Sequence, residues 1–268
     1  MGRRWRNAWR NWPGITGDSL AFKSLADGVS TSRTAWATLA GSVVLIVLSR
    51  TSHSPAVGYG YGFVVFASLS WPLVPRVLSR MRWHDATMIQ GVLLLLASIA
   101  LGSVGDRLLG FNPQAHSLNH LSWPVASKLL WSFPLLLPVE NFMLLGGLLS
   151  LWNGFKPRTV LARVGVGLLA AWLFGLWHVP FWGWPTMWVV GLSVVPWTLY
   201  LLATGDMVAP IVAHLLMDTF SIMAVASPRG SLLHHYAIPV VVVAVLAVSA
   251  GHSFWKDFQK ARTISSST

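Results

Sequence analysis

Long apolar stretches, separated by short polar connections, run through most of this chain. Such stretches are candidates for membrane-spanning helices, because a bilayer core about 30 Å thick needs roughly 20 apolar residues in a helix. The eight candidates cover residues 35–49, 56–75, 86–104, 124–152, 159–181, 184–203, 207–225 and 236–251. The pattern predicts an all-α, polytopic membrane helix bundle with about eight transmembrane helices.

Composition agrees with a membrane location. Hydrophobic residues make up 54% of the 268 residues and charged residues only 10%, and the mean hydropathy is +0.59. Soluble domains carry about 25% charged residues, so this chain cannot cover a globule with charge. These values exclude a soluble enzyme, a secreted disulfide scaffold and a disordered protein. The absence of cysteine also excludes thiolate catalysis and Cys-ligated metal sites.

Lysine and arginine are concentrated in alternate connections. The N-terminus, residues 76–82, residues 156–163 and the C-terminal tail are rich in them. The connections in between hold at most one each, namely Arg50, Arg107 and Arg229, and Lys128 lies near the outer end of the fourth stretch. Connections rich in Lys and Arg stay in the cytoplasm, so about eight helices place both termini on the cytoplasmic side.

The same pattern accounts for the net charge of +11. In a soluble protein this charge would suggest nucleic-acid binding, but membrane orientation explains it here, and no nucleic-acid partner is expected. We expect a basic cytoplasmic segment over residues 1–34, a transmembrane bundle over residues 35–251 and a cytoplasmic tail over residues 252–268. The sequence therefore predicts a multi-pass protein of the cell membrane, with the lipid bilayer as its surroundings.

Ionisable residues inside the apolar stretches are the candidates for function. A charge at the bilayer centre costs about 2.5–3.5 kcal/mol on insertion scales, so such residues are rare without a role. Those that qualify are Glu140, His178, His214 and Asp218, and Glu140 is the only glutamate of the chain. A helical rise of about 1.5 Å per residue allows all of them to share one cavity near the middle of the membrane.

Each of these residues also has a structural interpretation. Glu140 can be a neutral carboxylic acid bonded to the backbone, and His178 can belong to an interfacial aromatic belt. His214 and Asp218 are four residues apart and so share a helical face. They can form a self-contained pair that joins two helices, or the aspartate can orient the imidazole and set its tautomer. Pro138 weakens the helix just before Glu140, as is tolerated beside a polar cavity.

Three short motifs resemble those of the CPBP family of intramembrane proteases, which includes CAAX proteases and bacteriocin-processing proteins. That family shows Glu-Glu-x-x-x-Arg, then Phe-x-x-x-His, then His-x-x-x-Asn or Asp, each in its own helix. The matching residues are Glu140 in the first motif, Phe174 and His178 in the second, and His214 and Asp218 in the third. Asn141 and Leu145 replace the second Glu and the Arg of the first motif. The resemblance covers roughly residues 124–225, and the first 120 residues add only the number of helices to it.

The resemblance implies a bundle of about eight helices with a cavity open to the cytosol, and hydrolysis of a peptide bond in or near the membrane. It implies that Glu140 activates a water as general base, that His178 and His214 position this water or hold the oxyanion, and that Asp218 supports them. Asn141 and Phe174 are expected as supporting residues. Some family members cleave the last three residues from prenylated C-termini, and others process peptides or confer bacteriocin immunity. A membrane-associated peptide or protein, lipidated in some members, is therefore the expected substrate.

The sequence leaves the metal question open. The family has been described both as metal-dependent and as glutamate-dependent. Glu140, His178 and His214 are residue types that bind zinc, but they lie on three helices and no His-Glu-x-x-His motif occurs. We favour a glutamate mechanism, with either no cofactor or zinc.

Two other functions compete with proteolysis. Because Asn141 and Leu145 depart from the motif, the chain can be a catalytically inactive membrane scaffold or a bacteriocin-immunity protein on the same fold. A proton-coupled transporter can also use intramembrane Glu, His and Asp side chains as a relay. Transporters are typically built from repeats with matching halves, whereas the polar residues here are confined to the later part of the chain.

Overall fold

The structure is a computed structural model that describes residues 20–52, 54–81, 83, 85–111 and 121–226. Within these ranges the chain is helical and contains no strand. The helices are α2 (Leu20–Ala26), α3 (Thr31–Thr51), α4 (Pro55–Leu69), α5 (Leu73–Arg80), α6 (Asp85–Leu109), α8 (Trp123–Phe155), α9 (Val160–Trp177), α10 (Val179–Trp182), α11 (Thr186–Thr204) and α12 (Val208–Ala226). The prediction of an all-α protein is confirmed for these residues.

Six of the described helices or helix pairs are long and apolar enough to cross a membrane: α3, α6, α8, α9 together with α10, α11 and α12. This supports an integral membrane protein with at least six candidate spans in the described part of the chain. The predicted eighth span, over residues 236–251, lies outside the described residues. So do the C-terminal tail and the first 19 residues.

The second predicted span is not one continuous helix. It is divided into α4 and α5, which meet at an angle of 102°. Pro72 begins the new helix direction as the N-cap of α5. A proline has no N–H to donate and its ring clashes with the carbonyl four residues earlier, so it kinks or breaks a helix. The number of candidate spans is 7 if α4 and α5 together are counted as one broken span.

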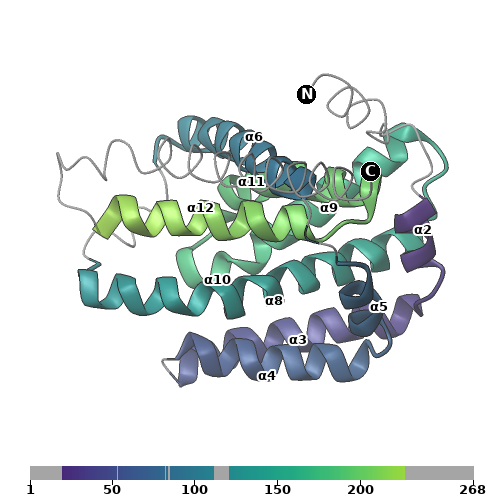
Figure 1. Cartoon of the computed structure of the whole chain (residues 1–268), viewed down its shortest axis with the longest axis horizontal. Helices are drawn as coiled ribbons and strands as arrows, with labels where there is room; N and C mark the ends of the chain where they lie inside the picture. Colours follow the sequence, from purple (N-terminus) through teal and green to yellow (C-terminus); the bar gives the residue numbers. More distant parts are fainter. Residues whose placement is uncertain (1–19, 53, 82, 84, 112–120, 227–268) are drawn as a thin grey trace, which may run out of the picture.

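Helix α8 runs through the middle of the bundle. Figure 1 shows the α3–α4 hairpin on one side of it and α12 on the other, and α9 also packs against it. In the most apolar window of α8, 67% of the residues are buried, against 22% for α3. Helix α8 is therefore the central helix, whereas much of α3 is left to face lipid.

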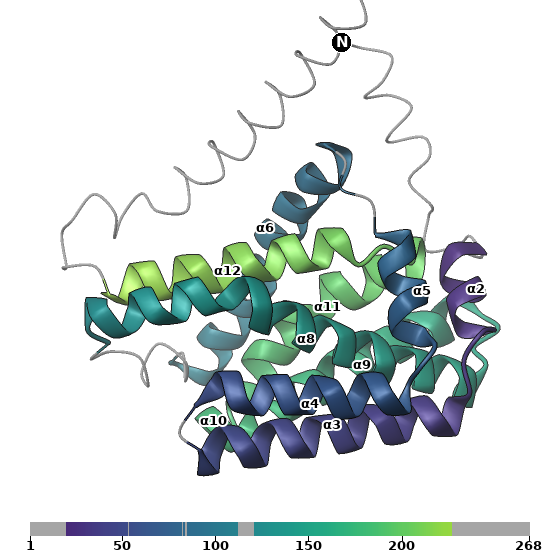
Figure 2. The same cartoon turned by 60° about the horizontal axis from the view of Figure 1, so that its bottom comes forward.

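The two ends of the bundle differ. At one end, which we call the α2 end, Arg80 Nη1 in α5 lies 2.9 Å from Ser24 Oγ in α2. Asn153 Nδ2 near the end of α8 donates to Ala26 O over 2.8 Å, and Arg33 Nε donates to Leu69 O over 2.6 Å. The opposite end, which we call the α10 end, holds the α3–α4 turn, α10 and the last turn of α12, as Figure 2 shows.

Helices α9 and α11 make a close contact through glycines. A Cβ added to Gly175 would clash with the backbone of α11. It would overlap Met187 O and lie 2.7 Å from Gly191 N. Small residues let helix backbones approach closely inside a membrane. This contact holds the last turn of α9, and therefore the residue that follows it, His178, against α11.

We expect Gly175→Ala to lower the stability of the bundle, by about 1–3 kcal/mol, because backbone atoms of α11 cannot move away as a flexible side chain can. Gly165→Ala in the same helix is the matched control, since a Cβ there meets nothing within 4 Å. Its expected effect is neutral or stabilising by up to about 1 kcal/mol. Thermal unfolding of both variants in detergent measures the difference. Equal midpoints would contradict the close contact.

Candidate active site

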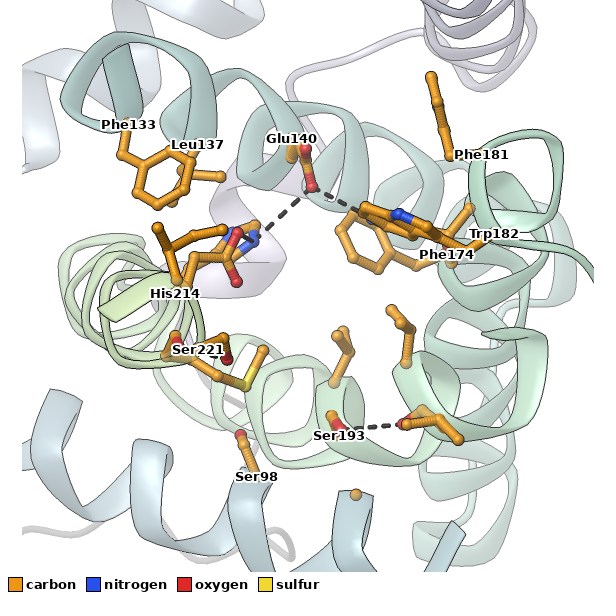
Figure 3. Close-up of a pocket in the computed structure, with 18 of the residues that line it drawn as sticks. Ser98, Phe133, Leu137, Glu140, Phe174, Phe181, Trp182, Ser193, His214 and Ser221 are labelled. Carbon is orange, nitrogen blue, oxygen red and sulfur yellow. Dashed lines mark hydrogen bonds and ion pairs between the residues drawn. The ribbon is translucent and has the colours of Figure 1, made fainter. Parts of the chain in front are cut away.

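The four intramembrane ionisable residues come together from three helices. Glu140 Oε2 in α8 lies 3.5 Å from Nε2 of His178, the C-cap residue of α9, and 3.7 Å from Nε2 of His214 in α12. Asp218 Oδ2, one turn further along α12, lies 3.7 Å from the same His214 Nε2. Figure 3 shows the Glu140 carboxylate directed into a pocket, with a dashed line to His214. Glu140 and both histidines are buried.

The local fold determines how His178 presents its ring. His178 is the C-cap of α9 and the N-cap of α10, and Pro180 lies in the first turn of α10. A proline is tolerated there because the first N–H groups of a helix have no partner within it. His178 Nδ1 lies 2.8 Å from the carbonyl oxygen of Phe174. A carbonyl oxygen can only accept, so Nδ1 carries a proton and donates it. In the neutral ring, Nε2 is therefore an acceptor, and it faces Glu140.

Asn141 determines the opposite proton position for His214. Its side-chain Nδ2 donates to Leu137 O over 3.0 Å and lies 2.9 Å from His214 Nδ1. A carbonyl oxygen can only accept a hydrogen bond, so the amide atom that contacts Leu137 O must be the nitrogen of Asn141. The same nitrogen therefore faces His214 Nδ1. His214 Nδ1 is then the acceptor, and in the neutral ring the proton sits on Nε2. The two histidines thus face Glu140 with opposite capabilities, one accepting and one donating.

Asp218 does not contact His214 Nδ1, the nitrogen whose hydrogen-bond partner determines the tautomer. It faces Nε2, on the same side as Glu140, while Asn141 occupies Nδ1. The side chain of Asp218 is 31% exposed, against 5% for Glu140. Asp218 therefore lies between the buried groups and the open part of the pocket.

Tyr59 is the site residue that sequence reasoning missed. Its hydroxyl, from helix α4, donates to Glu140 Oε1, so a residue outside the stretch that the resemblance covers belongs to the site. Glu140 Oε2 has no hydrogen-bond partner among the described residues. One signal could have identified Tyr59. It is one of only four tyrosines and lies in an apolar stretch, where a phenolic hydroxyl needs a polar partner.

Aromatic rings enclose both imidazoles. Trp182 stacks on His178 with ring centroids 5.4 Å apart and an interplanar angle of 12°. Trp197 lies 4.8 Å from His214, and Phe174 contacts both histidines, at 4.8 and 6.4 Å. These rings pack against both imidazoles and limit their rotation.

The site forms part of the wall of a cavity of about 700 Å³. This lies within the range of small-molecule and peptide pockets, about 300–1,000 Å³. Most of its wall is apolar, with residues such as Phe133, Leu137 and Phe181, and the serines at 98, 193 and 221 add polar points (Figure 3). The cavity can therefore receive an apolar segment next to Glu140.

The donor atoms of the site are poorly arranged for a metal ion. Among the described residues, no group of three or more His, Asp or Glu side chains has the arrangement of a metal site. The tautomer that Asn141 imposes also puts a proton on His214 Nε2, the nitrogen that faces Glu140, whereas a metal ligand needs a free lone pair there. These residues do not fit a zinc ion in this arrangement.

No protein-family model matches this chain, and neither a curated protein nor a solved structure matches it. The resemblance to intramembrane proteases therefore rests on the short motifs alone. The structure also shows the surroundings of the two residues that depart from the first motif. Asn141 bonds to His214, and Leu145 is fully buried in the main apolar core.

We expect Tyr59→Phe to destabilise the bundle by about 1–3 kcal/mol, because it leaves Glu140 Oε1 buried without its donor. Tyr61→Phe is the matched control, since Tyr61 lies on the same helix and is 62% exposed. Thermal unfolding of the detergent-solubilised variants measures the effect. A Tyr59→Phe variant as stable as Tyr61→Phe would show that the hydroxyl contributes nothing to holding the carboxylate.

Proposed function

We propose that this protein is an intramembrane endopeptidase, which hydrolyses a peptide bond of a membrane-associated substrate. One observation carries the proposal: the Glu140 carboxylate oxygen without a hydrogen-bond partner faces two imidazole nitrogens, one accepting and one donating, in the wall of an apolar cavity. A structural carboxylic acid would satisfy both of its oxygens. The resemblance of the three motifs to intramembrane proteases points to the same reaction.

The reaction follows from these proton positions. A water bound between Glu140 Oε2 and His178 Nε2 donates a hydrogen bond to each and gives one proton to the carboxylate. The resulting hydroxide attacks the carbonyl carbon of the peptide bond, and the carbonyl oxygen becomes an oxyanion. His214 Nε2–H donates to this oxyanion. The C–N bond then breaks as the leaving nitrogen takes the proton back from Glu140, which restores the carboxylate.

The cavity wall supports an apolar substrate. Phe133, Leu136 and Leu137 from α8 and Val190 and Val194 from α11 face the space next to the site. An apolar peptide segment or a lipid chain attached to the peptide gains free energy by entering such a space, at about 25 cal/mol per Å² of buried apolar surface. A lipidated tail and an apolar helix end are both compatible with this wall.

A second function has its own support. Leu145, at the position of the family arginine, packs in the core, and Asn141 has replaced a carboxylate. A membrane scaffold or bacteriocin-immunity protein that has lost the reaction would keep the helix contacts and tolerate such changes. It predicts that Glu140 can be replaced without a proteolytic consequence, provided that the bundle folds.

We expect Glu140→Gln to abolish cleavage, lowering the rate by about 10²–10⁴-fold, because an amide cannot act as general base. The measurement compares peptide termini in membranes that contain equal amounts of wild-type and variant protein. Asp27→Asn is the control, since it makes the same change from carboxylate to amide at an exposed position outside the site, and its termini should match those of the wild type. A chelator added to the wild type tests the metal question separately. Identical termini for wild type and Glu140→Gln would favour the scaffold.

We expect Asn141→Leu to lower kcat by roughly 10²-fold at nearly constant KM, because without the amide His214 no longer holds its proton on Nε2 to stabilise the oxyanion. Cleavage of a peptide identified from the termini measures this change. ¹⁵N NMR of labelled histidine provides an independent readout, in which the His214 tautomer signal should move in the variant. A kcat loss without a tautomer change would assign Asn141 a purely structural role.

A further inference from the structure

The cavity lies entirely toward one end of the bundle. Its lining comes from the last turn of α3 and the first turns of α4, and from residues 98–106 of α6. It continues with residues 129–140 of α8, residues 174–182, residues 189–197 of α11 and residues 214–225 of α12. In every one of these helices this is the part toward the α10 end. Neither α2 nor α5 contributes a residue, and among the lining residues Arg50, Pro55 and Ser221 are exposed at the α10 end.

The basic residues lie mainly at the other end. Of the described Lys and Arg residues, those at the α2 end are Lys23, Arg33, Arg76, Arg80, Lys156, Arg158 and Arg163. Those at the α10 end are Arg50, Arg107 and Lys128. Membrane proteins keep the end richer in Lys and Arg in the cytoplasm. This distribution directs the α2 end to the cytoplasm and the α10 end, with the cavity, to the opposite side.

Exposed tryptophans mark a lipid–water boundary at each end. Trp36, Trp71 and Trp83 are exposed near the α2 end. Trp123, Trp131, Trp184 and Trp188 are exposed near the α10 end. Tryptophan gathers at both surfaces of a bilayer, so the membrane normal runs roughly from one end of the bundle to the other. The charge difference between the ends is then a difference between the two sides of the membrane.

The catalytic groups lie between the middle of the bundle and the α10 end. Glu140 precedes Phe155, at the α2 end of α8, by 15 positions, which is about 22 Å at a helical rise of about 1.5 Å. His178 follows the first residue of α9, Val160, by 18 positions, or about 27 Å. Glu140 is also 17 positions from Trp123, at the other end of α8, so it lies near the middle of that helix. His178 lies at the α10 end of α9.

We propose that the cavity takes its substrate from the extracytoplasmic side, as an apolar, membrane-proximal peptide segment of a secreted or membrane-anchored protein. This proposal depends on the proposed peptide hydrolysis and specifies the class of substrate for it. It runs against the cytosol-open cavity that the family resemblance implies. It also makes a prenylated C-terminal tail an unsuitable substrate, because such a tail anchors in the cytoplasmic leaflet.

The absence of cysteine from the chain makes a direct test simple, since each introduced cysteine is unique. Ser52→Cys lies in the α3–α4 turn at the α10 end, Ser79→Cys lies on α5 at the α2 end, and Ser221→Cys lies in the cavity wall; all three serines are exposed. Intact cells that express each full-length variant are treated with a membrane-impermeant maleimide, and again after permeabilisation. We expect Ser52→Cys and Ser221→Cys to label at least 10-fold more than Ser79→Cys in intact cells, and Ser79→Cys to label only after permeabilisation.

Other labelling patterns overturn parts of the inference separately. Labelling of Ser79→Cys but not Ser52→Cys in intact cells reverses the orientation and overturns it. Labelling of Ser52→Cys with none at Ser221→Cys in either sample overturns entry into the cavity from that side. These results do not depend on activity, so they are distinct from a failure of the proposed hydrolysis, in which wild type and Glu140→Gln yield identical termini. New termini that map to extracytoplasmic segments support the substrate class, and termini in cytoplasmic tails overturn it.

Discussion

The burial of one carboxylate is the constraint on which the site depends. Glu140 is 4% exposed in the central helix of a membrane bundle, where an uncompensated charge is costly. Its partners come from three other segments: Tyr59 on α4, His178 at the end of α9 and His214 on α12. The helices must therefore pack so that these groups meet, and the Gly175 contact between α9 and α11 and the α3–α4 hairpin both contribute to that packing.

The contacts behind the two histidines give them different chemistry. The Phe174 carbonyl leaves His178 with an acceptor toward Glu140, and the Asn141 amide leaves His214 with a donor. Asn141 also explains how a departure from the family motif can be useful. An amide donates to both Leu137 O and His214 Nδ1, whereas an ionised carboxylate at that position donates to neither. Leu145, in contrast, contributes only to core packing.

The break between α4 and α5 makes the bundle asymmetric. Because Pro72 stops a straight helix, α5 turns by 102° and lies beside α2, where Arg76 donates to Gly28 O. The α2 end is closed by hydrogen bonds from arginine side chains to backbone carbonyls, and it carries most of the described basic residues. The cavity occupies the opposite, α10 end, which carries fewer of the described basic residues.

The sequence by itself determined the helical, membrane-embedded character of the chain and identified Glu140, His178, His214 and Asp218 as candidates. Both depend on local properties, namely hydropathy, spacing along a helix and the rarity of ionisable groups in apolar stretches. Only the tertiary structure decided that Tyr59 holds the carboxylate, that Asn141 contacts His214 Nδ1, and that the cavity lies at the α10 end. These features depend on which faces of distant helices meet. In a membrane, where water does not compete, each buried polar group bonds to whatever partner that packing brings within reach.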